Sequence, residues 1–188
     1  SDVCSSDLSI WHRSMTPASR PPRSVITDLT AWPFPDYDLL HHHILSDNCV
    51  RACDEPTLRT LMPWSHLRHY IITSRGCPHH CSYCSNSALQ HTLGTGHALR
   101  FRSVDHVMKE IEEIKARFPF LRAFAIMDDS FFFKPAGWVE EFCERFRPVD
   151  ASFGVLIHPR TVTRERMEML IDAGLIGIQM GLQSGSDR

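Results

Sequence analysis

The chain has 188 residues, of which 43% are hydrophobic and 22% are charged, a composition typical of a globular protein rather than a disordered one. Its formal net charge is −2, with Lys and Arg scattered, so charge indicates neither a nucleic acid nor an anionic membrane as partner. No apolar run approaches the roughly 20 residues that a bilayer requires, and the N-terminus lacks the basic-then-apolar order of a secretion signal. We therefore expect a cytoplasmic protein.

The first third of the chain does not show the periodicity of a folded domain. Residues 1–8, SDVCSSDL, resemble a translated sequencing adapter, and we leave them out of the fold reasoning. Prolines interrupt every candidate helix in residues 9–63, which predicts an irregular linker with at most a turn or two of order at 25–29 and 58–61. We expect this linker to follow an upstream domain.

Residues 64–188 alternate short apolar runs with amphipathic segments, the pattern of βα units with parallel strands. Strands are predicted at 70–73, 121–127, 151–157 and 175–182. Helices are predicted at 104–118 with Ser103 as N-cap, at 135–146 with Pro135 in the first turn, and at 163–173, ended by Gly174. Four such units make half of a (β/α) barrel, which takes about 250 residues when complete. The sequence thus predicts a truncated α/β domain, inactive by itself.

A polar loop after the first predicted strand carries the strongest chemical signal. Its sequence, RGCPHHCSYC, places Cys77, Cys81 and Cys84 at spacings of four and three residues. Three thiolates on one tight loop can bind three corners of a 4Fe-4S cubane, and no fourth cysteine is near enough to complete the set. The fourth iron is left open, where it can chelate the amino and carboxylate groups of S-adenosylmethionine and pass an electron to its sulfonium.

This Cys-x-x-x-Cys-x-aromatic-Cys pattern resembles the hallmark of the radical S-adenosylmethionine superfamily, with Tyr83 at the aromatic position. The resemblance implies a partial TIM barrel, reductive cleavage of S-adenosylmethionine to a 5'-deoxyadenosyl radical, and a position for Tyr83 near the adenine. It also implies an electron donor such as flavodoxin or ferredoxin, and a small-molecule or peptide substrate that the sequence does not identify.

Further cofactor contacts are predicted where the later strands end. Asp128 and Asp129 stand where the superfamily contacts the amino group of S-adenosylmethionine, usually through a Gly-Gly-Glu-like segment. Gln183 and Ser184, in GLQSGSDR, resemble the segment Gly-x-Glu-Ser-Gly that touches the cofactor ribose and carboxylate, and Gln183 replaces the usual Glu with an uncharged amide. Arg160, whose guanidinium suits carboxylates, is a candidate for the cofactor or substrate carboxylate.

The double Asp and the linker passage WPFPDYDLL, residues 32–40, resemble the subgroup that carries an upstream cobalamin-binding domain. The resemblance implies a parent protein that holds cobalamin mainly through upstream residues and transfers a methyl group to an unactivated carbon. Carboxyl ends of parallel barrel strands meet at one mouth, so the predicted site residues should lie together there.

Other interpretations remain open. The parent protein could be a radical enzyme without cobalamin, methylthiotransferase-like or an oxidoreductase. The cysteine loop could instead be a non-catalytic zinc module that uses His79 or His80, although only His91 and His97 could serve as its second ligand pair and neither has paired spacing. The Asp pair could be a solvated turn, the glycine-rich segment could lack function, and Arg160 could be a plain surface residue. Cys143 lies in the apolar pattern of a helix and is predicted to be a buried thiol.

Overall fold

The structure is a computed structural model that describes residues 26–61, 68–93, 98–183 and 185. Its centre is a four-stranded parallel sheet with the order β3-β6-β7-β8. The strands are β3 (Arg68–Ile71), β6 (Ala123–Ile126), β7 (Ser152–Leu156) and β8 (Leu175–Gln179). Sequential parallel strands joined by helices are the arrangement of a partial TIM barrel, so the predicted α/β class is confirmed.

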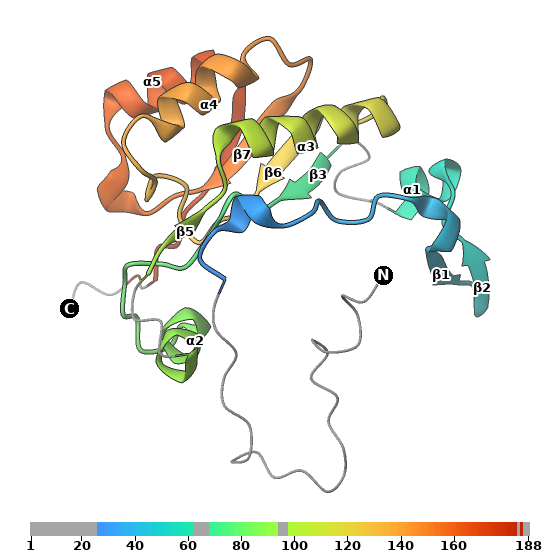
Figure 1. The fold of residues 1–188 in the computed structure, drawn as a ribbon, viewed down its shortest axis with the longest axis horizontal. Coiled ribbons are helices and arrows are strands. Elements are labelled where there is room, and N and C mark those ends of the chain that lie inside the picture. The colour runs from blue at the N-terminus through green and yellow to red at the C-terminus, as the bar shows by residue number, and fades with distance from the viewer. Residues whose placement is uncertain (1–25, 62–67, 94–97, 184, 186–188) are drawn as a thin grey trace, which may run out of the picture.

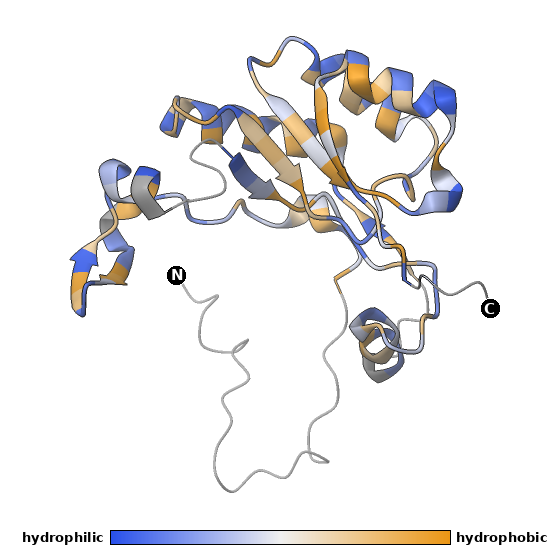
Figure 2. Cartoon of the chain, turned by 180° about the vertical axis from the view of Figure 1, so that it is seen from behind, coloured by the Kyte–Doolittle hydropathy of each residue, from blue (hydrophilic) through white to orange (hydrophobic). Residues whose placement is uncertain are grey.

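Three helices cover one face of this sheet (Figure 1). They are α3 (Val104–Arg117), α4 (Trp138–Phe146) and α5 (Arg164–Asp172). Their apolar sides and the facing residues of the strands form a single core, in which Phe124, Phe142 and Phe153 are fully buried. In Figure 2 the helices carry both hydrophobic and hydrophilic residues, as expected for helices that pack on a sheet with one side.

Most of the predicted element boundaries agree with the structure to within a few residues. Ser103 caps α3 by accepting a hydrogen bond from the backbone N–H of His106, and the chain leaves α5 at Gly174, whose φ is +106°. The predicted start of the second helix was wrong: α4 begins at Trp138, and Pro135 lies in the turn before it. The last strand is shorter than predicted and ends at Gln179.

The segment before the sheet contains more regular structure than its prolines predict. Its described part, residues 26–61, has two 3-10 helices, η2 (Leu29–Ala31) and η3 (Leu39–His41), a hairpin of β1 (His43–Ser46) and β2 (Cys49–Ala52), and α1 (Glu55–Leu61). The hairpin turns at Asp47 and Asn48, whose φ angles are +51° and +59°. Asp and Asn tolerate this left-handed conformation better than other non-glycine residues, so the Asp-Asn pair was the available signal for the hairpin.

Two further elements frame the cysteine loop. A short antiparallel pair joins β4 (Ser74–Arg75) to β5 (Arg100–Phe101), and α2 (Ser85–Leu93) begins directly after Cys84. Sequence patterns predicted neither, because β4 and β5 have two residues each and α2 has a weak apolar stripe. In the parts of the chain that the structure describes, no helix has the length and apolar character to span a bilayer.

Candidate active site

The cysteine loop leaves β4 through Gly76 and ends at the start of α2. Cys77 and Cys84 are half-buried, Cys81 is exposed, and all three are free thiols. Burial raises the pKa of the Cys77 thiol, and the nearby Asp129, Cys84 and Cys81 add to the effect. The three thiols are therefore close enough to influence one another's ionisation.

Backbone geometry restricts the first residue of the loop to glycine. Gly76 has a φ of +100°, and a Cβ placed there would lie 2.9 Å from the carbonyl oxygen of Ala98. That distance is too short for a real contact with rigid backbone, so a side chain would push the loop away from Ala98, in the segment just before β5.

Helix α2 fixes the loop from its other end. The Gln90 side-chain amide donates a hydrogen bond of 2.8 Å to the carbonyl oxygen of Cys77, and the Ser87 hydroxyl donates one of 3.1 Å to the carbonyl oxygen of Cys81. The backbone N–H of Cys84 donates to the same Cys81 carbonyl. These bonds hold the loop backbone through the carbonyl oxygens of Cys77 and Cys81, and none of them uses a cysteine thiol.

The two predicted aspartates have different surroundings. Asp129 is exposed, and its carboxylate accepts hydrogen bonds from the backbone N–H of Gly76 (3.1 Å) and the side-chain amide of Asn86 (2.7 Å). It therefore lies directly beside the cysteine loop. Asp128 is only 1% exposed, and Thr73, Ser74 and Lys134 occupy both of its oxygens. The structure does not place Asp128 where a cofactor could reach it. Of the two aspartates, only Asp129 remains a predicted cofactor contact.

Tyr83 and Gln183 lie in contact although 100 residues separate them in sequence. The Tyr83 hydroxyl donates a short hydrogen bond to the Gln183 side-chain oxygen, and the Tyr83 side chain is otherwise 71% exposed. Desolvation raises the pKa of Tyr83, and Cys81 beside its hydroxyl raises it further. Tyr83 of the cysteine motif and Gln183 after β8 thus lie side by side at the sheet edge.

Two histidines and a phenylalanine from three different loops also meet at this edge. The rings of His79 and His158 stack with centroids 4.3 Å apart, and Phe133 contacts His79 edge-on at 5.3 Å. Arg160 follows His158 on the exposed surface, and its backbone N–H donates to His158 Nδ1. Desolvation lowers the pKa of His158, and His79 and Arg160 lower it further. The loops after β3, β6 and β7 therefore converge, as parallel strands predict.

Sequence reasoning missed several residues that shape the site: Thr73, Asn86, Gln90 and Lys134. Lys134 offered a signal, because a lone lysine after a run of three phenylalanines is unusual at a buried position. The polar residues on α2 offered none, since Asn86 bonds the Asp129 carboxylate 43 residues away and Gln90 bonds the carbonyl oxygen of Cys77 13 residues away. The predicted Ser184 lies outside the described residues.

The donor set suits a 4Fe-4S cluster better than a single ion. Each cysteine of a cubane binds a different iron, so the three sulfurs need not converge on one point. A zinc site does require convergence of its ligands. Within residues 26–61, 68–93, 98–183 and 185, no three His, Cys, Asp or Glu side chains converge on a common point as a single metal ion would require. His97, one candidate for the zinc alternative, lies outside those ranges.

Comparison with known proteins agrees with this geometry. The sequence model of the Radical SAM superfamily matches residues 71–188, and the chain belongs to that superfamily. Its fold is similar to that of a radical S-adenosylmethionine methyltransferase, TsrM from Kitasatospora setae. In a structure with tryptophan substrate and an S-adenosylmethionine analogue bound, the TM-score is 0.52 at 22% identity, over 64% of this chain and 22% of the TsrM chain.

A second TsrM structure, with cobalamin and a [4Fe-4S] cluster bound, gives a TM-score of 0.50 at 22% identity. The likeness there covers 63% of this chain and 22% of the TsrM chain, so the chain spans about a fifth of the length of these solved proteins. No curated protein matches the sequence. The family and the fold are thus established, and the reaction is a matter for proposal.

Proposed function

We propose that Cys77, Cys81 and Cys84 hold three irons of a 4Fe-4S cluster and leave the fourth iron for S-adenosylmethionine. The observation that carries the proposal is the loop itself, in which three free thiols sit on a backbone fixed at both ends, by Gly76 and by α2. When bound, such a cluster supplies one electron that cleaves S-adenosylmethionine into methionine and a 5'-deoxyadenosyl radical.

The surrounding residues are proposed to bind the cofactor. Asp129 offers a carboxylate for the amino group, and Arg160 offers a guanidinium for a carboxylate of the cofactor or the substrate. Tyr83 and Gln183, already paired, would receive the adenine and the ribose. We also propose the ribose and carboxylate contact for Ser184. These assignments follow the family resemblance, and the exposure of Asp129, Tyr83, Arg160 and Gln183 is compatible with them.

For the complete protein we propose a cobalamin-dependent methyl transfer to an unactivated carbon, with cobalamin held mainly by an upstream domain. The domain limits that we propose are those of the sequence: a linker at 9–63 and a radical core from residue 64. The passage at 32–40 and the Asp pair support the subgroup, and the likeness to TsrM supports the fold. A cytoplasmic location and an electron donor such as flavodoxin or ferredoxin belong to the same proposal.

The test compares two exposed cysteines in the product of the complete reading frame, reconstituted anaerobically with iron and sulfide. Cys81→Ala should abolish the iron–sulfur absorbance and the cleavage of S-adenosylmethionine. Cys49→Ala, an exposed cysteine of the hairpin, should retain about four irons per chain and full cleavage.

Three results would contradict parts of this proposal. Retained cleavage in Cys81→Ala would exclude that residue as a ligand. A colourless wild-type protein that binds zinc would favour the zinc module. Cleavage without any dependence on cobalamin would leave the cluster assignment intact and favour a cobalamin-independent radical enzyme.

A further inference from the structure

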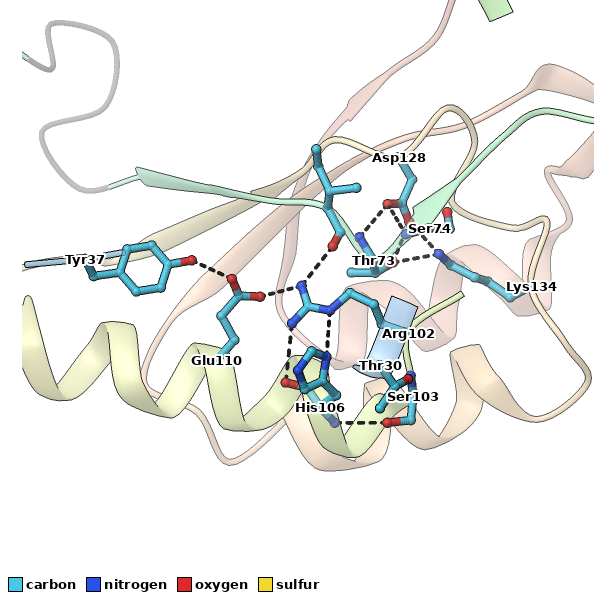
Figure 3. A network of polar contacts seen from close by, with 11 residues as sticks. Thr30, Tyr37, Thr73, Ser74, Arg102, Ser103, His106, Glu110, Asp128 and Lys134 are labelled. Carbon is cyan, nitrogen blue, oxygen red and sulfur yellow. Dashed lines mark hydrogen bonds and ion pairs between the residues drawn. The ribbon is translucent and has the colours of Figure 1, made fainter. Parts of the chain in front are cut away.

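Residues 72–74 connect β3 to the cysteine loop, and they lie outside the hydrogen-bond ladder of the sheet. The last bond between β3 and the segment after β6 runs from the backbone N–H of Met127 to the carbonyl oxygen of Ile71. Beyond it, two buried charged side chains bind the backbone of residues 72–74, one on each side (Figure 3). Gly76 and Cys77 follow within three residues.

Asp128 binds the donor side of this segment. One of its carboxylate oxygens accepts the backbone N–H groups of Thr73 (2.7 Å) and Ser74 (2.8 Å), and the other accepts the Thr73 hydroxyl. The counter-charge is Lys134, whose ammonium group pairs with Asp128 and contacts the Thr73 hydroxyl at 2.6 Å. The Lys134 side chain is 1% exposed and lies over the ring of Trp138. Burial lowers the pKa of Lys134, and Asp128 opposes that shift.

Arg102 binds the acceptor side of the same segment. Its guanidinium donates to the carbonyl oxygen of Ile72 at 2.9 Å, and its backbone N–H donates to the carbonyl oxygen of Thr73 at 2.9 Å. Its counter-charge is the buried Glu110, which also accepts a hydrogen bond from the Tyr37 hydroxyl. The backbone before the cysteine loop is therefore held by an anion and a cation, and each has its own buried partner.

We infer that the pairs Asp128–Lys134 and Arg102–Glu110 are positioning residues of the cysteine loop; this inference rests on the proposed function of that loop. Charge-assisted hydrogen bonds in a buried setting are shorter and stronger than neutral ones, so the pairs fix residues 72–74 more tightly than a ladder would. They act through the backbone and do not touch the cluster or the cofactor. The two aspartates thus have different roles in this proposal: Asp128 holds the start of the loop, and Asp129 faces the ligand.

The experiment uses the full chain without iron, under reducing conditions, and measures how fast an alkylating reagent modifies each cysteine. Asp128→Asn keeps the shape of the side chain but removes its charge and leaves Lys134 without a buried partner. Loss of one charge-assisted hydrogen bond corresponds to about a tenfold change in a local opening equilibrium, so the half-buried Cys77 should react about tenfold faster. Buried Cys143 should react as in the wild type.

Asp105→Asn is the matched control, because Asp105 forms an exposed ion pair with Lys109 on the surface of α3. It should leave the reactivity of Cys77 unchanged. If Asp128→Asn does not fold, Thr73→Val carries the same test, since it removes only the hydroxyl that joins Asp128 to Lys134. In reconstituted protein, Asp128→Asn should also alter the electron paramagnetic resonance spectrum of the reduced cluster, which a loss of global stability would not do.

Two outcomes would overturn the inference. One is unchanged reactivity of Cys77 in both Asp128→Asn and Thr73→Val. The other is equal acceleration at Cys77 and Cys143, which would mean that the variants loosen the whole core. Because labelling needs no cluster, a failure to bind iron would refute the proposed function and leave these rates interpretable.

Discussion

Substitution of Gly181 by alanine should break the hydrogen bond between Tyr83 and Gln183 without changing either residue. An ideal Cβ at position 181 would lie 2.1 Å from the side-chain nitrogen of Gln183 and 3.2 Å from its Cδ. The backbone at Gly181 does not have a positive φ, so alanine is allowed there. Because the clash involves the end of a flexible side chain, we expect Gln183 to move and its hydrogen bond with Tyr83 to break.

The magnitude follows from the exposure of this pair. A neutral hydrogen bond between exposed groups contributes about 1 kcal/mol, which corresponds to about a fivefold change in an equilibrium. Gly→Ala also reduces the entropy of the unfolded chain, which favours folding by about 0.4–1 kcal/mol. We therefore expect the affinity for S-adenosylmethionine to fall about fivefold, with no decrease in the unfolding midpoint.

Two measurements check this prediction. With tyrosine labelled by carbon-13, the chain gives three side-chain signals, and the Tyr83 signal should shift in Gly181→Ala. Equilibrium dialysis of the reconstituted protein gives the affinity. Gly177→Ala is the control, because a Cβ there would meet no atom within 4 Å, and it should leave the Tyr83 signal in place. An unshifted Tyr83 signal in Gly181→Ala, or the same shift in the control, would refute the reasoning.

Two further predictions concern the core. Phe142→Ala removes a fully buried ring, so the free energy of unfolding measured in urea should fall by about 3–5 kcal/mol. Leu45→Ala, on the exposed hairpin, should change it by less than about 0.5 kcal/mol. Equal losses in the two variants would contradict the assigned core. Burial raises the pKa of the Cys143 thiol from 9.0 to about 11. At about pH 8 it should therefore react about 100-fold more slowly than a free thiol whose pKa is 9.0. The stability that this thiol contributes is complete below pH 9.0 and is lost as the pH rises through about 11, so a stability that stayed constant there would contradict the assignment.

The family and the fold class could be predicted from the sequence because each depends on local order. Strands of the core follow from short apolar runs and its helices from an apolar period of 3.6 residues, which are properties of consecutive residues. The spacing of Cys77, Cys81 and Cys84 fixes which thiols share a loop. The hairpin at 43–52 was missed because its signal is two turn residues rather than a period.

Only the tertiary structure decided which polar residues meet, and in what roles. Successive residues at a strand end point in opposite directions, so one of Asp128 and Asp129 had to turn inward, and nothing local indicates which. The buried partner of Asp128 is Lys134, and the partner of Tyr83 is Gln183; both depend on how distant segments pack. Sequence determined the chemical groups of this site, and long-range contacts determined that Asp128 holds the backbone while Asp129 stays exposed beside the cysteine loop.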